Sequence, residues 1–507
     1  MAPSALSNGY MKVVSTVRKG LCNGRCRSVE FRKEQLRQLK KMYTDHKEDF
    51  IQALSKDLRK ISLLILVQMH LSILGVSDMP HLIGNSIDLA FLIPFDKSII
   101  YNEPYGLVLV LGAWNYPMQL SMLPVHGAIA AGNAVIVKPS EVSPATADLM
   151  AKLLPQYIDK DCYQIVLGGV KETTELLQNR FDYIFYTGSP GVGKIVRDAA
   201  NQYLTPCTLE LGGKSPCYID DSVDLDMAVR RIMWGKMVNL GQTCIAPDYL
   251  ICSKRMQGKF IDKSKQILKE WYGENPKESE SLSRIVAERH VDRLASLLES
   301  GTIAHGGKYD KESRWMEPTI LIDVPLDSKV MKEEIFGPIL PIINFENYVD
   351  AMEFINKREK PLALYLFTSD KELQNSFLTN VSAGGVCIND TIFHAGSPNL
   401  PFGGVGNSGM GSYHGKYSFE TFTHKKSVLS RSYNGLIEKA MKNRFPPYTP
   451  GKQRFLTSQG DKSDGPGLLK ILRVIFTHGI SAVIGAALLY AQFRLSDDNG
   501  IESPVEM

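Results

Sequence analysis

The sequence predicts an α/β protein with a doubly wound, Rossmann-type domain and a second α/β domain. From residue 106 onward, short β-branched and aromatic runs alternate with helical stretches, a pattern typical of parallel sheets. The alternation resumes after residue 211 and continues to about residue 400. A chain of 507 residues with 44% hydrophobic content can bury more than one core, so two or three domains are expected.

The elements follow in order. Residues 28–58 space apolar side chains between charges, as in amphipathic helices with one buried stripe. The first sheet is predicted from four runs that each end in turn residues, namely GLVLVLGAW, NAVIVKPS, YQIVLG and FDYIFYTGS. Sheets of this kind bind ligands beyond the carboxyl ends of their strands.

Residues 61–76, ISLLILVQMHLSILGV, are almost continuously apolar. We expect a buried helix here, because Gln68 and His70 interrupt the run and it is shorter than the roughly twenty residues that span a bilayer.

Composition excludes some classes of function. A charged fraction of 22% and a net charge of +4 argue against a nucleic-acid-binding protein. Eight scattered cysteines indicate a reducing compartment. Cys22 and Cys26 lack a second nearby pair that would complete a zinc site, so we expect surface thiols and no metal. The N-terminus has no charged head followed by an apolar core, so no signal peptide is expected.

A thiol and a carboxylate stand beside glycines in the central stretch of the chain. Glu210 lies in LELGGKSP and Cys244 in NLGQTCIAP. Glycines let the backbone approach a ligand, so this pattern suggests a covalent site with its own base. A lone cysteine is nevertheless more often a core residue.

These two motifs are accompanied by GAWNYP at 112–117, KPSE at 138–141, EEIFGP at 333–338 and PFGGVGNSGMG at 401–411. In this order they resemble the aldehyde dehydrogenase superfamily, class 3 type. GQTCIAPDY and the apolar tail are most similar to its membrane-bound fatty aldehyde dehydrogenase branch. Segment 61–76 departs from the family, which carries a more charged amphipathic helix there.

The resemblance implies the catalytic roles. The Cys244 thiolate adds to the aldehyde carbon, and the side-chain amide of Asn115 with the Cys244 backbone N–H holds the oxyanion. Glu210 is the general base that activates water to cleave the thioester. Acylating relatives that transfer the thioester to coenzyme A lack this carboxylate.

The resemblance also implies an NAD site, with NADP possible. Lys138 and Glu141 would bind ribose hydroxyls, the loop with Gly188, Ser189 and Gly193 would face the pyrophosphate, and two further residues, Glu334 and Phe336, would contact the nicotinamide ribose and ring. The loop TGSPGVGK also matches a phosphate loop, but that motif needs a Ser or Thr where Ile195 stands.

We expect five parts of the chain: a coenzyme-binding domain (1–85 and 106–210), a catalytic domain (211–405), an oligomerisation element (86–105 and 406–430), a linker (431–470) and a C-terminal membrane anchor (471–493). The resemblance implies a homodimer.

The anchor prediction rests on a largely apolar run with basic residues before it and Asp497 and Asp498 after it. This places the catalytic part in the cytosol, anchored to the endoplasmic reticulum or else the peroxisome. An amphipathic helix that lies on the membrane interface or docks on a partner subunit is the alternative.

The predicted function is NAD(P)-dependent oxidation of medium to long aliphatic aldehydes to carboxylic acids. The main alternative is a tail-anchored, non-catalytic scaffold that keeps the fold. A cysteine hydrolase is a third reading, and it would need a histidine base near Cys244.

Overall fold

The computed structural model describes residues 5–59, 87–88, 97–431, 433, 435, 438 and 442–453. The predicted helix at 61–76 and the predicted anchor at 471–493 lie outside these residues. The chain divides into two compact units, one of residues 1–89 and 98–428 and another of residues 90–97 and 429–507. All the candidate site residues belong to the first unit.

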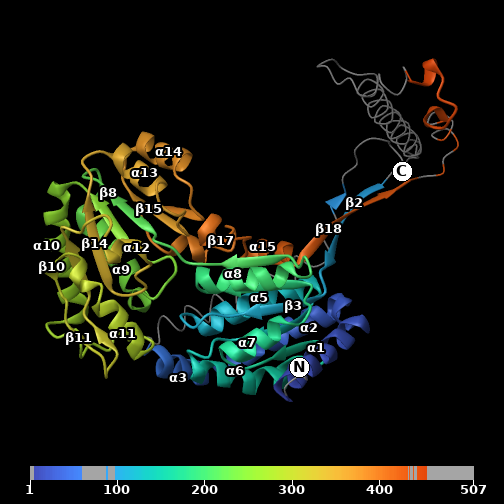
Figure 1. Ribbon diagram of the computed structural model, residues 1–507, viewed down its shortest axis with the longest axis horizontal. Coiled ribbons are helices and arrows are strands. Elements are labelled where there is room, and N and C mark those ends of the chain that lie inside the picture. The colour runs from blue at the N-terminus through green and yellow to red at the C-terminus, as the bar shows by residue number, and fades with distance from the viewer. Residues whose placement is uncertain are drawn as a thin grey trace, which may run out of the picture. The chain divides into compact units, whose positions relative to one another are not determined.

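The first large sheet confirms the predicted Rossmann-type arrangement (Figure 1). Its strands run in the order β17-β7-β6-β3-β4-β5, and all are parallel except β17. The strands are β3 (Leu107–Leu111), β4 (Ala134–Lys138), β5 (Tyr163–Ile165), β6 (Tyr183–Thr187), β7 (Cys207–Glu210) and β17 (Gly409–Met410). The chain winds outward from β3 through β5 and then returns to β6, so the order reverses between β3 and β6. Ligands of such sheets bind at this point.

Helices connect these strands. Because the central strands are buried along their whole length, they need cover on both faces. The helices α5 and α6 pack together with α2, whereas α1 and α8 each contact α7. The helices of this part are α1 (Ala5–Cys22), α2 (Val29–Asp45), α3 (Lys47–Leu58), α5 (Pro117–Ala131), α6 (Pro144–Tyr157), α7 (Val170–Leu177) and α8 (Pro190–Asn201), with a short 3-10 turn η1 (Arg25–Arg27).

The second large sheet confirms the second α/β domain. Its order is β10-β13-β14-β9-β8-β15-β16, parallel except for β10. The strands are β8 (Pro216–Ile219), β9 (Tyr249–Cys252), β10 (Thr302–His305), β13 (Thr319–Ile322), β14 (Ile339–Asn344), β15 (Ala363–Phe367) and β16 (Gly385–Ile388), and a separate hairpin pairs β11 (Tyr309–Asp310) with β12 (Trp315–Met316). Its helices are α9 (Leu225–Met237), α10 (Lys254–Tyr272), α11 (Glu288–Ala295), α12 (Lys329–Lys332), α13 (Tyr348–Asn356) and α14 (Lys371–Asn380), with 3-10 turns η3 (Val238–Gly241), η4 (Leu298–Ser300) and η5 (Phe393–Gly396).

The glycine-rich segment at 401–411 joins the edge of the first sheet. Gly409 of β17 lies opposite Glu210 of β7. A Cβ on Gly409 would stand 2.3 Å from the Leu209 carbonyl oxygen, so only glycine allows this pairing. The turn η6 (Gly406–Ser408) precedes β17, and α15 (Gly415–Thr421) follows it and packs on α5.

A three-stranded sheet in the order β1-β2-β18 joins the two ranges predicted as an oligomerisation element. It consists of β1 (Ile87–Asp88), β2 (Lys97–Pro104) and β18 (Thr423–Ser430), and a last 3-10 turn, η7 (Lys442–Arg444), follows. Lys426 Nζ of β18 lies 2.6 Å from Glu103 Oε1 of the central strand β2. The predicted domain limits and the subunit role of this sheet stay predictions.

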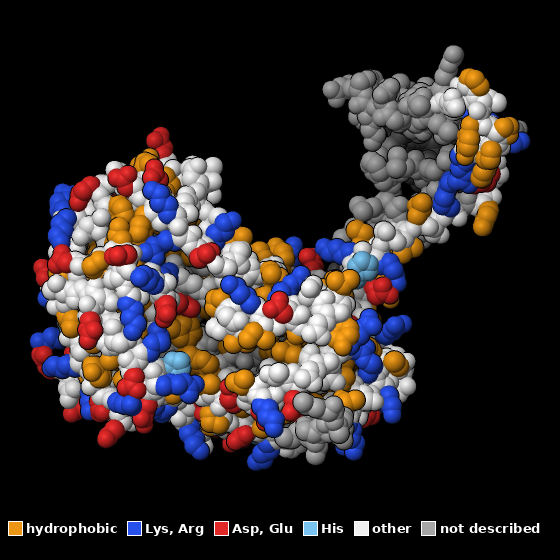
Figure 2. Space-filling model, viewed as in Figure 1, with side chains coloured by type: hydrophobic (Ala, Val, Ile, Leu, Met, Phe, Trp, Pro, Cys, Tyr) orange, Lys and Arg blue, Asp and Glu red, His pale blue; other side chains and the backbone are white. Residues whose placement is uncertain are grey.

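On the face that Figure 2 shows, Lys and Arg side chains are interspersed with Asp and Glu. One sequence-based expectation is wrong: Cys22 is exposed, but Cys26 is fully buried in the core around the first sheet. The turn η1 folds the chain back between α1 and α2, and this carries Cys26 inward. None of the helices in the described ranges is both long and apolar enough for a membrane span.

Candidate active site

Four predicted site residues lie at the carboxyl ends of neighbouring strands of the first sheet. Asn115 follows β3, Lys138 ends β4, Gly188 follows β6 and Glu210 ends β7. The Gly188 amide donates to the Glu210 carbonyl oxygen at 3.0 Å, which joins the predicted coenzyme loop to the strand of the predicted base. These residues therefore share the edge at which doubly wound sheets bind ligands.

Cys244 lies in a loop with an unusual backbone. Asn239 and Leu240, which precede it in η3, adopt left-handed φ values of 53° and 54° although neither is glycine. Such conformations cost free energy and cluster at functional sites. Gly241 takes φ 74°, and a Cβ there would stand 2.2 Å from the Gly337 carbonyl oxygen. The loop thus packs directly against the segment that carries Glu334 and Phe336.

The Asn115 side chain is tied to this loop. It is only 3% exposed, and its Nδ2 donates to the Gln242 carbonyl oxygen at 3.1 Å, two residues before Cys244. The Asn239 side chain donates in turn to the Asn115 carbonyl oxygen at 3.0 Å. The adjacent pair, Tyr116 and Thr243, shares a hydroxyl hydrogen bond of 2.7 Å. Two separate motifs are thereby locked together around the thiol.

Glu210 is 2% exposed, and within the described ranges neither carboxylate oxygen has a hydrogen-bond partner. A buried polar group without a partner is costly, so its persistence calls for a functional reason. Burial raises the pKa of Glu210 well above its ordinary value. A carboxylate that binds its proton more tightly and has unused acceptor sites is suited to accept a proton from water.

The Glu334 carboxylate has close neighbours that the Glu210 carboxylate lacks. A Cβ on Gly212 would stand 2.2 Å from its Oε2, so that glycine makes room for the carboxylate. Burial raises the pKa of Glu334 to about 8, and the charge of Asp248 adds to this rise. The Gly213 amide and the cations of Lys214 and Arg293 oppose it. Glu334 is thus held by the backbone, whereas Glu210 keeps its oxygens available.

The same environment shifts the pKa of the Cys244 thiol. Burial raises the pKa of Cys244, and the charges of Glu334 and Glu210 raise it further, while the amides of Cys244 and Ile245 lower it. Because burial raises the pKa of both carboxyl groups, each gives up its proton less readily than an ordinary carboxyl group and therefore opposes a nearby thiolate less. The two amides then supply the favourable field that a thiolate or oxyanion needs.

The residues around the first sheet also fit a dinucleotide. Lys138 is buried, and its Nζ lies 3.3 Å from the Glu141 Oε2, so a cation and a carboxylate stand together where a ribose can bind both. Ser189 caps α8, and Gly191 in the first turn of that helix has open space where a side chain would lie. Helix N-termini of this kind favour pyrophosphate. Gly193 is buried, and a Cβ there would stand 2.7 Å from Leu211 Cδ2.

Phe336 lies near the predicted catalytic loop. It has a left-handed φ of 51°, and its ring meets Trp114 edge-on at 5.3 Å between centroids. Trp114 also contacts His290 at 5.5 Å. These rings join the residue before Asn115 to the segment that carries Glu334.

Two charged residues of this site were missed from the sequence. Lys214 forms a close ion pair with Asp248 and donates to the carbonyl oxygens of Val330 at 2.7 Å and Glu333 at 2.9 Å. Asp248 accepts from the Ile335 amide at 2.9 Å. The pair fixes the backbone on both sides of Glu334. The available signal was the position of both charges next to the buried strands β8 and β9, since Lys214 lies within LELGGKSP and Asp248 directly follows NLGQTCIAP.

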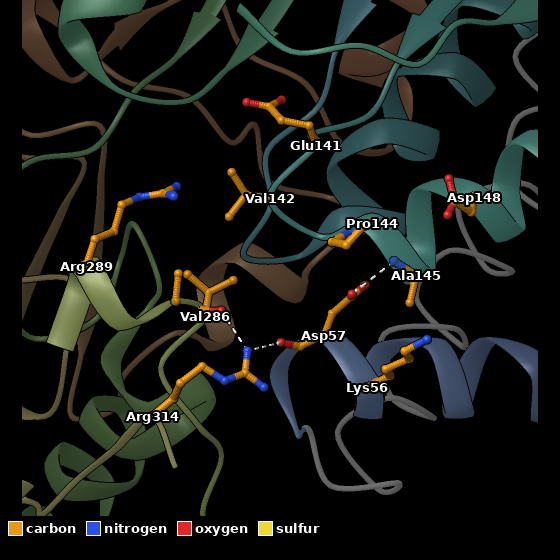
Figure 3. Close-up of a pocket in the computed structure, with 11 residues that line it drawn as sticks. Lys56, Asp57, Glu141, Val142, Pro144, Ala145, Asp148, Val286, Arg289 and Arg314 are labelled. Atoms are coloured by element: carbon orange, nitrogen blue, oxygen red, sulfur yellow. Dashed lines mark hydrogen bonds between the residues drawn. The ribbon is translucent and has the colours of Figure 1, made fainter. Parts of the chain in front are cut away.

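A pocket of about 520 Å³ opens beside Glu141 (Figure 3). Residues of α3, the start of α6, α11 and Arg314 line it. The described ranges bring together no group of three His, Cys, Asp or Glu side chains that could hold a metal ion.

Comparisons with known proteins agree with this geometry. The model of the aldehyde dehydrogenase family matches residues 9–428. The chain is 49% identical over 483 residues to aldehyde dehydrogenase family 3 member A2 of Rattus norvegicus, covering 93% of this chain and 98% of that protein. It is also 49% identical over 448 residues to a dimeric, NADP-preferring aldehyde dehydrogenase of Mus musculus, covering 87% and 98%. A solved structure of Staphylococcus aureus AldH in a substrate-bound state is 40% identical, with a TM-score of 0.84, and the match covers 89% of this chain and 99% of that one.

Proposed function

Because this chain belongs to the aldehyde dehydrogenase family, whose reaction is NAD(P)-dependent aldehyde oxidation, we propose that Cys244, Asn115 and Glu210 carry out that reaction here. The observation that carries the proposal is the unpartnered, buried Glu210 carboxylate beside the Cys244 loop. A fold retained only for structure has no reason to keep that cost.

Each residue has a distinct task. The Cys244 thiolate adds to the carbonyl carbon, and the Asn115 amide with the Cys244 backbone N–H stabilises the oxyanion that forms. Loss of one such donor typically costs about 10² to 10³ in rate. When bound, NAD or NADP supplies the acceptor for the hydride that aldehyde oxidation releases. Cys244 then holds the acyl group as a thioester, and Glu210 removes a proton from the water that cleaves it.

The chain's own residues also orient the coenzyme. Lys138 and Glu141 would hold the adenosine ribose, and the first turn of α8, with Ser189 and Gly193, would hold the pyrophosphate. Glu334 and Phe336 would position the nicotinamide half. Their loop is fixed by the Lys214–Asp248 pair, so this half of the site is preorganised.

The substrate that we propose is a medium to long aliphatic aldehyde. Cys244 packs partly buried against an apolar core together with Ile392, Ala395 and Phe402. The Tyr365 hydroxyl donates to the Ile245 carbonyl oxygen and accepts from the Ile392 amide at 3.4 Å, so this apolar segment adjoins the Cys244 loop. An apolar approach to the thiol favours an alkyl chain.

We expect hexadecanal to exceed propanal in kcat/KM by about tenfold or more, because each buried methylene contributes about 0.8 kcal/mol until the apolar surface is filled. The measurement is NADH absorbance with protein that ends at Ser463, so that the apolar tail does not affect solubility. Turnover of propanal without turnover of hexadecanal would reject the long-chain proposal and leave aldehyde oxidation intact.

We further propose that the protein is a homodimer anchored in the endoplasmic reticulum membrane by residues 471–493, with the catalytic part in the cytosol. The apolar run and its basic near end support the anchor. The mouse relative named dimeric supports the dimer. An anchor would bring the enzyme to aldehydes that partition into lipid.

The anchor predicts how the protein fractionates. In expressing cells, the full chain should sediment with endoplasmic reticulum membranes and resist alkaline carbonate, while the chain ending at Ser463 should be released. Full-length protein extracted by carbonate would instead favour the alternative of a helix on the membrane surface. Recovery with peroxisomal markers would show that the anchor lies in the peroxisomal membrane, not in that of the endoplasmic reticulum.

A further inference from the structure

The pocket beside Glu141 contains a cation that the proposed reaction does not use. Figure 3 shows the Arg289 side chain reaching from α11 into the same space as the Glu141 carboxylate. Lys56, the lysine of the pocket, comes from α3 and points away from Glu141. The pocket thus places a guanidinium across from the carboxylate proposed to bind the adenosine ribose.

Two other charged groups of the pocket are already engaged. Asp57 caps α6 by accepting from the amides of Ala145 at 3.0 Å and Thr146 at 2.9 Å. Arg314 donates to the Val286 carbonyl oxygen at 2.7 Å and to that of Asp57 at 3.3 Å.

Arg289 differs from these two. Its side chain is exposed, and it has no hydrogen-bond or ion-pair partner within the ranges that the structure describes. Its five N–H donors are therefore available to a ligand in the pocket.

We propose that Arg289 binds the 2′-phosphate of NADP, so that one site takes both coenzymes. The inference rests on the proposed role of Glu141 at the ribose. Glu141 can accept a hydrogen bond from the free 2′-hydroxyl of NAD, but a phosphomonoester in that place carries about −1.5 to −2 charges and is repelled by a carboxylate.

A guanidinium across the pocket offsets this repulsion, since its planar fork binds two phosphate oxygens at once. The Glu141 side chain is 47% exposed and lies 3.3 Å from Lys138 Nζ, so its carboxylate has space to turn and a cation to turn toward. Glu141 thus binds the 2′-hydroxyl of NAD, and Arg289 binds the 2′-phosphate of NADP.

The test is direct binding without aldehyde. NADPH and NADH are titrated against the full chain by calorimetry, comparing wild type with Arg289→Gln, Arg289→Lys and Lys56→Gln. Arg289→Gln should weaken NADPH binding by about tenfold or more, because a charged hydrogen-bond pair is lost. NADH binding should stay within about twofold, since only an exposed charge is removed. The NADPH affinity of Arg289→Lys should lie between those of wild type and Arg289→Gln. The matched control, Lys56→Gln, should bind both coenzymes as wild type does.

Equal weakening of NADPH and NADH by Arg289→Gln would overturn the inference, as would an equal loss of NADPH binding in Lys56→Gln or unchanged NADPH binding in Arg289→Gln. Wild type that binds NADH but not NADPH would overturn it as well, while leaving the proposed coenzyme site standing. Wild type that binds neither would overturn the coenzyme site and the inference together.

Discussion

Cys244→Ala should reduce NADH formation from a long aliphatic aldehyde by on the order of 10⁴-fold or more, since loss of an attacking nucleophile removes the covalent route entirely. Coenzyme binding should persist, because the ribose and pyrophosphate residues lie on the first sheet. The measurement is steady-state NADH absorbance together with NADH titration of the variant. Mass spectrometry after mixing wild type with aldehyde and coenzyme should find the acyl group on the Cys244 peptide.

Cys387→Ala is the matched control. Cys387 is also a partly buried cysteine, but it lies in β16 and has no place in the proposed reaction. It should retain wild-type turnover. Equal activity in Cys244→Ala and wild type would reject the thioester mechanism. A folded wild-type protein that binds coenzyme but forms no NADH would support the non-catalytic scaffold.

Glu210→Gln should separate acylation from hydrolysis. Without a base for water, steady-state turnover should fall by about 10² to 10⁴-fold, the usual contribution of general base catalysis. Acylation should still occur, so the variant should show a burst of NADH close to one equivalent and then stall. Rapid-mixing absorbance measures both phases. A wild-type steady-state rate without a stalled burst would show that another group, such as Glu334, activates the water.

The pH dependence of this step has a defined sign. Only ionised Glu210 can accept a proton, so the rate of thioester hydrolysis in wild type should rise as pH rises through its pKa, which burial holds above the ordinary value. In Glu210→Gln this limb should disappear. The same shift affects the free energy of unfolding. Because the pKa of Glu210 is higher in the folded state than in the unfolded state, folding favours the protonated form, and wild type loses stability as pH rises above the ordinary pKa of a glutamate. Glu210→Gln should lose less stability over the same pH range. Thermal melting at several pH values checks that the variant is folded.

The order of short apolar strands and helices was sufficient to predict two α/β domains, because period and turn chemistry are local properties. The strands of the first sheet follow from short apolar runs that end in turn residues, whereas the reversal of strand order between β3 and β6 is visible only in the structure. Residue type and glycine neighbours likewise suggested Cys244 and Glu210 as candidates, and the resemblance to the family supplied their expected roles. All ten predicted site residues lie within the described ranges, and the candidate catalytic residues lie around one loop.

Long-range contacts could not be predicted this way. The burial of Cys26 depends on how η1 turns the chain into the core, and the spacing of the cysteines does not encode that turn. The Lys214–Asp248 pair was missed for the same reason, since its two partners are separated by 34 positions and support a loop that lies more than eighty positions further on.

By itself, the sequence determined the fold class, the family and the residue types available for chemistry, because these are set by local pattern and by the order of motifs. Only the tertiary structure decided which groups are free to act. It left the Glu210 carboxylate buried without a partner, tied Glu334 to the Gly213 amide and left the Arg289 guanidinium uncommitted beside Glu141. Burial and partners set the pKa and reactivity of a side chain, and they arise from contacts between distant segments, which no single stretch of sequence contains.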